Sequence, residues 1–112
     1  MLLDYFLVGM SEELLKVVEE VTGKSRDEGL REILVSYVER RMDECRRVIR
    51  RFEAKYGMSF EEFYEKLGND FPLDWEHERD AFDWEAAITE LEELERIKNE
   101  IGGIHKGSSG KC

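Results

Sequence analysis

Apolar side chains recur every three or four residues along most of this chain, which is the spacing of one face of an α-helix. Between these stretches stand glycines that can end a helix, and serine or aspartate residues that can cap the next one. The pattern predicts a mostly α-helical fold with helices over residues 11–22, 26–56, 59–67 and 74–101.

Two pairs of residues mark where helices begin. Ser25 is followed three positions later by Glu28, and Ser59 is followed in the same way by Glu62. In such a capping box the hydroxyl and the carboxylate each accept a hydrogen bond from a backbone N–H group of the first turn. Gly23 stands just before the first box and can take the left-handed backbone conformation that ends a helix. A tight helix-turn-helix is therefore predicted around Gly23.

The first ten residues have a different pattern. Leu2–Met10 is a short run rich in residues that favour β-strands, and it stops at a glycine and a possible cap, Ser11. A lone strand leaves its backbone N–H and C=O groups without partners. Because the rest of the chain offers no second strand of similar quality, we expect this strand to pair with its copy in a homodimer.

Charge changes the picture of what this protein can bind. The formal net charge is -10, and residues 57–112 carry 15 acidic and 6 basic side chains, whereas residues 42–56 carry 3 and 5. Affinity for a nucleic-acid backbone is mainly cationic, so the chain as a whole is not drawn to DNA and any DNA contact must be local. A basic partner suits the acidic C-terminal half.

The sequence lacks the residue patterns that several classes of function require. There is no Ser/His/Asp set, no Cys/His arrangement and no Gly-rich phosphate loop, so neither an enzyme nor a bound cofactor is expected. His77 lies among carboxylates without a second histidine at ligand spacing, which favours a solvated acidic face over a metal site. No apolar run approaches the ~20 residues of a membrane span. Cys45 and Cys112 do not form a disulfide pattern, which favours the cytoplasm.

The order of strand, capped helix, Gly-x-Ser turn and capped helix resembles the ribbon-helix-helix fold over about residues 3–41. The residues that carry the resemblance are Met10–Leu15, Thr22–Glu28, Leu30–Leu34, Tyr37 and Val38. It implies that two strands pair antiparallel across a two-fold axis, with Phe6, Val8 and Met10 facing the dimer core. It also implies that Lys24, Ser25 and Arg26, at the start of the second helix, hold a phosphate of operator DNA.

The chain departs from the ribbon-helix-helix pattern at the positions that would face DNA. Tyr5, Leu7 and Gly9 occupy these positions, and none of them is a usual reader of base edges. A dimer of this kind therefore lacks the side chains for specific recognition in the major groove.

The C-terminal part resembles the arm of small prokaryotic antitoxins that are encoded beside a toxin. The matching stretches are Phe52–Phe63, Trp75-Glu76, Asp80 and Asp83–Glu85. The resemblance implies an acidic arm that covers a basic toxin, with operator binding by the dimer as a second role. The expected partner-binding residues are the aromatic anchors and the carboxylates beside them, namely Trp75, Asp80, Phe82, Asp83, Trp84 and Glu85.

The same residues also allow other interpretations. The aromatic residues of the last helix could instead pack on the second helix, since apolar residues at helical spacing are usually core. Arg46, Arg47, Arg50 and Arg51 form a basic stripe that could contact a partner or neutralise acidic side chains of the same chain. The alternatives to an antitoxin are a ribbon-helix-helix transcriptional regulator without a toxin and a structural dimerisation module.

The predicted organisation has three parts. Residues 1–41 form a dimerisation unit of the ribbon-helix-helix type, residues 42–101 form a helical extension that binds the toxin, and residues 102–112 form a disordered tail rich in glycine and serine.

Overall fold

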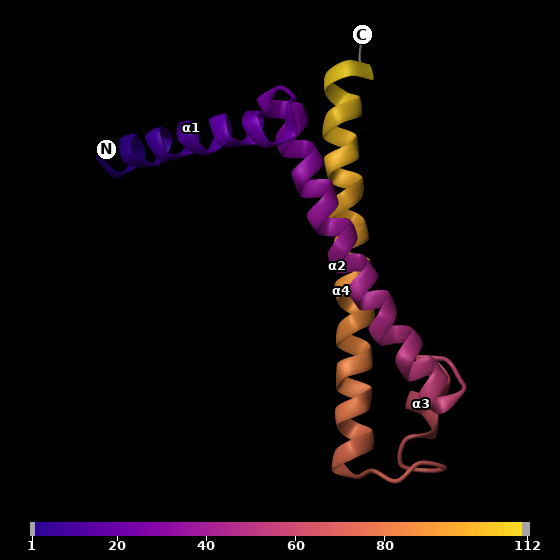
Figure 1. The fold of residues 1–112 in the computed structure, drawn as a ribbon. Helices are drawn as coiled ribbons and strands as arrows, with labels where there is room; N and C mark the ends of the chain where they lie inside the picture. Colours follow the sequence, from indigo (N-terminus) through magenta and orange to yellow (C-terminus); the bar gives the residue numbers. More distant parts are fainter. Residues whose placement is uncertain (1, 111–112) are drawn as a thin grey trace. The chain divides into compact units, whose positions relative to one another are not determined.

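The chain forms four α-helices in a computed structural model, which describes the backbone of residues 2–110 and the side chains of residues 12–103 (Figure 1). The helices are α1 (Leu2–Thr22), α2 (Arg26–Tyr56), α3 (Phe60–Lys66) and α4 (Trp75–Gly110). Within residues 2–110 there is no strand, and one isolated bridge joins Leu67 to Phe71. The prediction of a mostly α-helical fold is confirmed.

The beginning of the chain differs from the prediction. Residues 2–10, expected to form a strand, belong to α1. A helix satisfies most of its backbone hydrogen bonds within one chain, whereas a strand needs a neighbour, and leucine and methionine are good helix formers. The side chains of Phe6, Val8 and Met10, which were expected in a dimer core, lie outside the described residues.

The predicted caps are present at two helices. The Ser25 hydroxyl accepts a hydrogen bond from the Glu28 backbone N–H at 3.3 Å, before the first turn of α2. At α3 the capping box is complete, because Ser59 and Glu62 each accept a hydrogen bond from the other's backbone N–H. Gly23 has a φ of 69°, and its N–H donates to the Glu19 carbonyl at 2.9 Å. Local sequence therefore sets these boundaries.

The end of α4 lies beyond its predicted position. The helix continues to Gly110, whereas the sequence predicted an end at Ile101 and a disordered tail after it. No proline interrupts residues 102–110, so helical hydrogen bonds can continue despite the low helix propensity of glycine. Residues 111 and 112 lie outside the described residues.

The chain divides into two compact units within α2. Unit 1 is Met1–Tyr37 and unit 2 is Val38–Cys112, so the division falls a few residues before the boundary predicted after residue 41. Unit 1 contains α1 and the first part of α2, and unit 2 contains the second part of α2, α3 and α4.

The core of unit 2 consists of an aliphatic cluster and an aromatic cluster, and the second part of α2 lies beside α4 (Figure 1). The buried hydrophobic residues are Val38, Met42, Cys45, Phe52, Phe63, Ala81, Trp84, Ala87 and Leu94. The Trp84 ring is stacked on Phe52 at a centroid distance of 5.5 Å and lies at the same distance from Phe60 and Phe63. Trp84 is the centre of the aromatic cluster.

Unit 1 has no such core. Among its described side chains, residues 12–37, no hydrophobic side chain is buried. Seven large apolar side chains of its two helices are instead at least 38% exposed: Leu14, Val17, Val21, Leu30, Ile33, Leu34 and Tyr37. The described apolar stripes of this helix pair therefore lie largely on its surface.

Glycine at position 29 is required where α1 and α2 meet. A Cβ atom at Gly29 would lie 2.4 Å from Oγ1 of Thr22 and 2.8 Å from Cγ1 of Val18. Both neighbours are β-branched and stiff, and the Thr22 hydroxyl donates to the Val18 carbonyl at 2.7 Å. Neither side chain can move away freely.

Replacing Gly29 with alanine should therefore destabilise unit 1. Overpacking of about 1–3 kcal/mol outweighs the gain of up to about 1 kcal/mol in helix propensity. Faster hydrogen exchange of the α1 and α2 amides next to the turn would reveal this. Gly103→Ala is the matched control, since a Cβ there meets nothing within 4 Å and should be neutral or stabilising. Unchanged protection in Gly29→Ala would contradict the close contact.

Candidate partner-binding surfaces

The predicted partner-binding residues do not form one surface. Trp75, Asp80 and Asp83 line a pocket between α2 and α4, whereas Phe82 and Glu85 line a groove between α3 and α4. Trp84 lies in the core with 0% exposure. Residues that are neighbours along α4 separate in this way because successive residues of a helix point about 100° apart.

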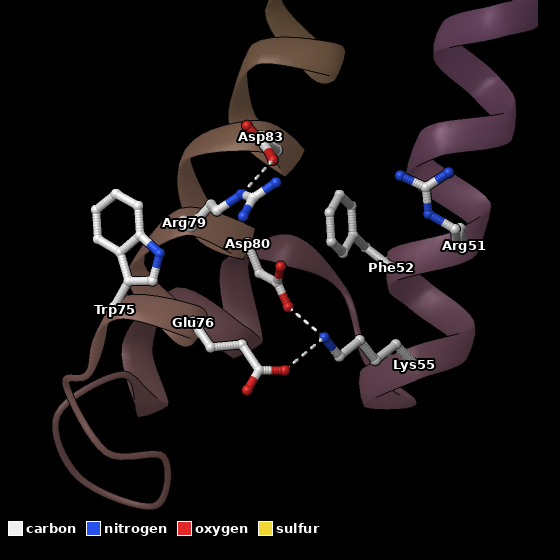
Figure 2. A pocket seen from close by; sticks show the side chains of 8 residues that line it. All are labelled: Arg51, Phe52, Lys55, Trp75, Glu76, Arg79, Asp80 and Asp83. Carbon is white, nitrogen blue, oxygen red and sulfur yellow. Dashed lines mark hydrogen bonds and ion pairs between the residues drawn. The ribbon is translucent and has the colours of Figure 1, made fainter.

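The α2/α4 pocket has a volume of about 470 Å³ (Figure 2). It is lined by Arg51, Phe52, Lys55, Trp75, Glu76, Arg79, Asp80 and Asp83. Its three cations are matched by three carboxylates, and the Lys55 ammonium lies 2.6 Å from Asp80 and 3.2 Å from Glu76. A pocket with charges balanced in this way has little net attraction for an ion of either sign.

Asp80 is the hub of a polar cluster that links α2 to α4. Its Oδ2 atom accepts hydrogen bonds from the Tyr56 hydroxyl at 2.5 Å and from the Lys55 ammonium. Burial by itself would raise the pKa of Asp80, but these two hydrogen bonds hold it below its ordinary value. Burial and the nearby Asp80 raise the pKa of Tyr56 to about 12. The ionised carboxylate is therefore the form that stabilises unit 2.

Replacing Asp80 with asparagine should lower the free energy of unfolding of unit 2 by about 1–3 kcal/mol at neutral pH. Because the folded state lowers the pKa of Asp80, its contribution is complete above about pH 4 and disappears as the pH falls through the folded pKa. The difference between wild type and variant should accordingly shrink in acid.

Urea unfolding followed by circular dichroism over a pH series measures this difference. Asp70→Asn is the control, since Asp70 makes an exposed ion pair with Lys66 at 3.2 Å that should contribute little. An equal effect of the two substitutions, or a difference independent of pH, would contradict the role assigned to Asp80.

The α3/α4 groove has a different character. Its volume is about 460 Å³, and its lining residues are Tyr64, Leu67, Leu73, Glu78, Ala81, Phe82 and Glu85. Tyr64, Leu73 and Phe82 are 60%, 63% and 73% exposed. A second hollow continues from Phe82 along α4 and is lined by Phe82, Glu85, Ala86, Thr89, Glu90 and Glu93. The surface is apolar with carboxylates at its edge.

Trp84 does not serve as a surface anchor in this structure. Its indole is enclosed by the aromatic side chains of α2 and α3, and its Nε1 atom has no hydrogen-bond acceptor among the described residues. The alternative that the aromatic residues of α4 pack on α2 therefore holds for Trp84. Trp75, which is 77% exposed, and Phe82 stay accessible to a partner.

The residues expected to hold a phosphate are engaged within unit 1. The Lys24 ammonium lies 3.1 Å from Glu32. Arg26 pairs with Glu12, and its Nε atom lies 3.1 Å from Glu19. The two cations have carboxylate neighbours, while the Ser25 hydroxyl caps α2. These contacts weaken the attraction of this turn for a phosphate.

The arginine stripe of α2 has mixed surroundings. Arg46 pairs with Asp43 at 3.0 Å, and the Arg51 guanidinium lies 5.4 Å from the centre of the Phe52 ring. Arg47 and Arg50 are exposed and make no ion pair with any residue that the structure describes. The expected neutralisation within the chain is thus seen only for Arg46.

Further ion pairs join α2 to α4 in unit 2. Arg41 pairs with Glu90, and Glu39 lies 2.9 Å from Lys98, so α2 and α4 are also joined by charge. Among the described residues, no group of three potential metal ligands comes together. The described helices also include none that is long and apolar enough to cross a membrane.

Sequence reasoning missed the contribution of α3 and of the turn after it. Tyr64 lies in the helix predicted over residues 59–67 and Leu73 precedes the helix predicted from residue 74; neither was expected in a partner-binding surface, yet both line the groove. The sequence feature that could have revealed them is the presence of large apolar residues outside the stripe that faces the core.

Comparison of the chain with protein-family models, curated protein sequences and solved structures gives no match.

Proposed function

We propose that the protein is an antitoxin-type binder, a homodimer that neutralises a basic partner protein through unit 2. The observation that carries this proposal is the exposure of Trp75 and Phe82 on a unit that buries other aromatic side chains in its own core. Large exposed aromatic side chains are typical anchors of protein interfaces.

Charge supports a basic partner. Residues 57–112 carry 15 acidic and 6 basic side chains, and Glu78, Asp83 and Glu85 are exposed on the same helix as the two aromatic anchors. Carboxylates around an apolar patch speed the approach of a cationic protein and disfavour nucleic acid or anionic lipid. A small basic toxin encoded by a neighbouring gene has this chemistry.

Unit 1 supplies the dimer in this proposal. Its exposed apolar stripes need a cover, and a second copy presents the same stripes to them. In the ribbon-helix-helix arrangement, residues 2–10 of two chains pair as strands. Dimerisation would then convert the first half of α1 from helix to strand, with Phe6, Val8 and Met10 in the shared core.

Co-expression of the full chain with the products of its neighbouring genes, followed by affinity capture and mass determination of the complex, tests the function. We expect a stable complex with a small basic protein that arrests growth when expressed alone. The double variant Trp75→Ala with Phe82→Ala should weaken this complex. Both side chains are exposed, so the variant should stay folded, as circular dichroism can verify.

Recovery of the homodimer alone, together with neighbours that are harmless when expressed without it, would overturn the proposal. Tight and strongly salt-dependent binding of operator DNA by that dimer would instead indicate the transcriptional regulator.

A further inference from the structure

We infer that the α3/α4 groove and its continuation along α4 form the docking site for a basic amphipathic helix of the partner protein. This inference rests on the proposed function and narrows it: it assigns the binding to one of the two hollows of unit 2, so that Phe82 is the anchor for this helix and Trp75 is not. The α2/α4 pocket then has a structural role through its internal ion pairs.

The two hollows have a shape that suits a helix. Phe82 stands between the groove and its continuation and contributes to both, so the two hollows form one path along α4. Phe82, Ala86, Thr89 and Glu93 recur at helical spacing on the side of α4 away from Trp84. A straight stripe of this kind fits another helix laid alongside it.

The acidic side chains of the groove favour a positively charged partner. Glu78 and Glu85 flank Phe82, and neither makes an ion pair with any residue that the structure describes. Other carboxylates of α4 do have cationic neighbours: Asp80 has Lys55, and in the continuation of the groove Glu90 has Arg41 and Glu93 has Arg96. The linings of the groove and its continuation contain no lysine or arginine. Glu78 and Glu85, which have no ion pair among the described residues and lie beside apolar side chains, therefore favour a cationic partner.

Spacing defines the segment that fits. Glu78 and Glu85 are seven residues apart, which places them about 10 Å apart along the helix axis. A helix with lysine or arginine every seven residues and leucine on the adjacent face matches both carboxylates. Its leucine side chains would contact Tyr64, Leu73 and Phe82.

The probe for this site is a synthetic helical peptide with lysine and leucine in heptad positions, titrated into the full-length protein by calorimetry. A peptide of the same composition in scrambled order, without an amphipathic face, is the ligand control. We expect the ordered peptide to bind and the scrambled one to bind much more weakly. Equal binding of the two would overturn the inference, since it would show a purely electrostatic attraction.

Two pairs of variants locate the binding. Phe82→Ala should weaken binding of the ordered peptide about tenfold or more, whereas Trp75→Ala, on the pocket side, should change it little. Glu78→Gln with Glu85→Gln should weaken binding and reduce its salt dependence. Glu92→Gln with Glu95→Gln removes the same charge from exposed positions of α4 outside the groove and is the matched control.

The outcomes separate this inference from the proposed function. If the cognate protein binds wild type and Phe82→Ala equally, the groove is not the site although the function stands. If both glutamate pairs weaken peptide binding equally, the groove inference also fails. If no cognate protein is found, the proposed function fails, while the peptide titration still decides whether the groove accepts a basic helix.

Discussion

Trp84→Ala is expected to unfold unit 2. The indole is fully buried, stacks on Phe52 and contacts the rings of Phe60 and Phe63, so its removal leaves a large cavity where α2, α3 and α4 meet. Truncation of a buried tryptophan costs about 3–5 kcal/mol, a large part of the typical stability of a small domain. Little folded unit 2 should remain.

Chemical denaturation followed by circular dichroism measures this loss. Trp75→Ala is the matched control, because the same side chain is removed from a position that is 77% exposed, and its effect should stay within about 0.5 kcal/mol. Similar stabilities of the two variants would contradict the central role of Trp84. A consequence for binding studies is that loss of a partner in Trp84→Ala would report unfolding and not the position of the interface.

Leu34→Glu should abolish the homodimer that we propose for unit 1. Leu34 lies in the exposed apolar stripe of α2, and a glutamate there would place a carboxylate without a partner in each half of the interface. A buried, unpaired charge is worth several kcal/mol, which corresponds to a dissociation constant raised about a hundredfold or more. The chain should then sediment as a monomer.

Sedimentation equilibrium over a range of concentrations distinguishes the two states. Ser36→Glu adds the same charge to an exposed position of α2 outside the apolar stripe and should leave the dimer intact. A wild-type chain that stays monomeric at high concentration would refute the dimer. Infrared or circular dichroism spectra of the dimer would also show whether residues 2–10 gain strand content, as the ribbon-helix-helix arrangement requires, or stay helical.

The internal helix boundaries were the features most readily predicted from this sequence, whereas the start of α1 and the end of α4 were not. The capping pairs of Ser25 with Glu28 and Ser59 with Glu62, and the glycine at position 23, act over three or four residues, so their effect does not depend on the rest of the fold. The first ten residues show the limit of such reasoning. Leu2–Met10 has residues suited to a strand, but a strand needs a neighbour, and a single chain satisfies the same backbone groups as a helix.

The candidate site was only partly predictable for a related reason. Trp75, Phe82 and Trp84 all belong to one acidic and aromatic stretch, and composition cannot tell which of them is buried. The position of each around α4 decides this, and it depends on where α2 and α3 pack. The groove wall formed by Tyr64 and Leu73 comes from α3 and the turn after it, which only the tertiary structure brings beside Phe82.

By itself, the sequence determined the helical class, the caps and the acidic C-terminal half, because these follow from local hydrogen bonding, side-chain periodicity and residue counts. The tertiary structure decided which apolar side chains are buried and which carboxylates are paired. Asp80 meets Tyr56 and Lys55 across more than twenty residues of chain, whereas Glu78 and Glu85 remain without a cationic partner among the described residues. Such contacts arise from the packing of separate helices, which no local pattern specifies.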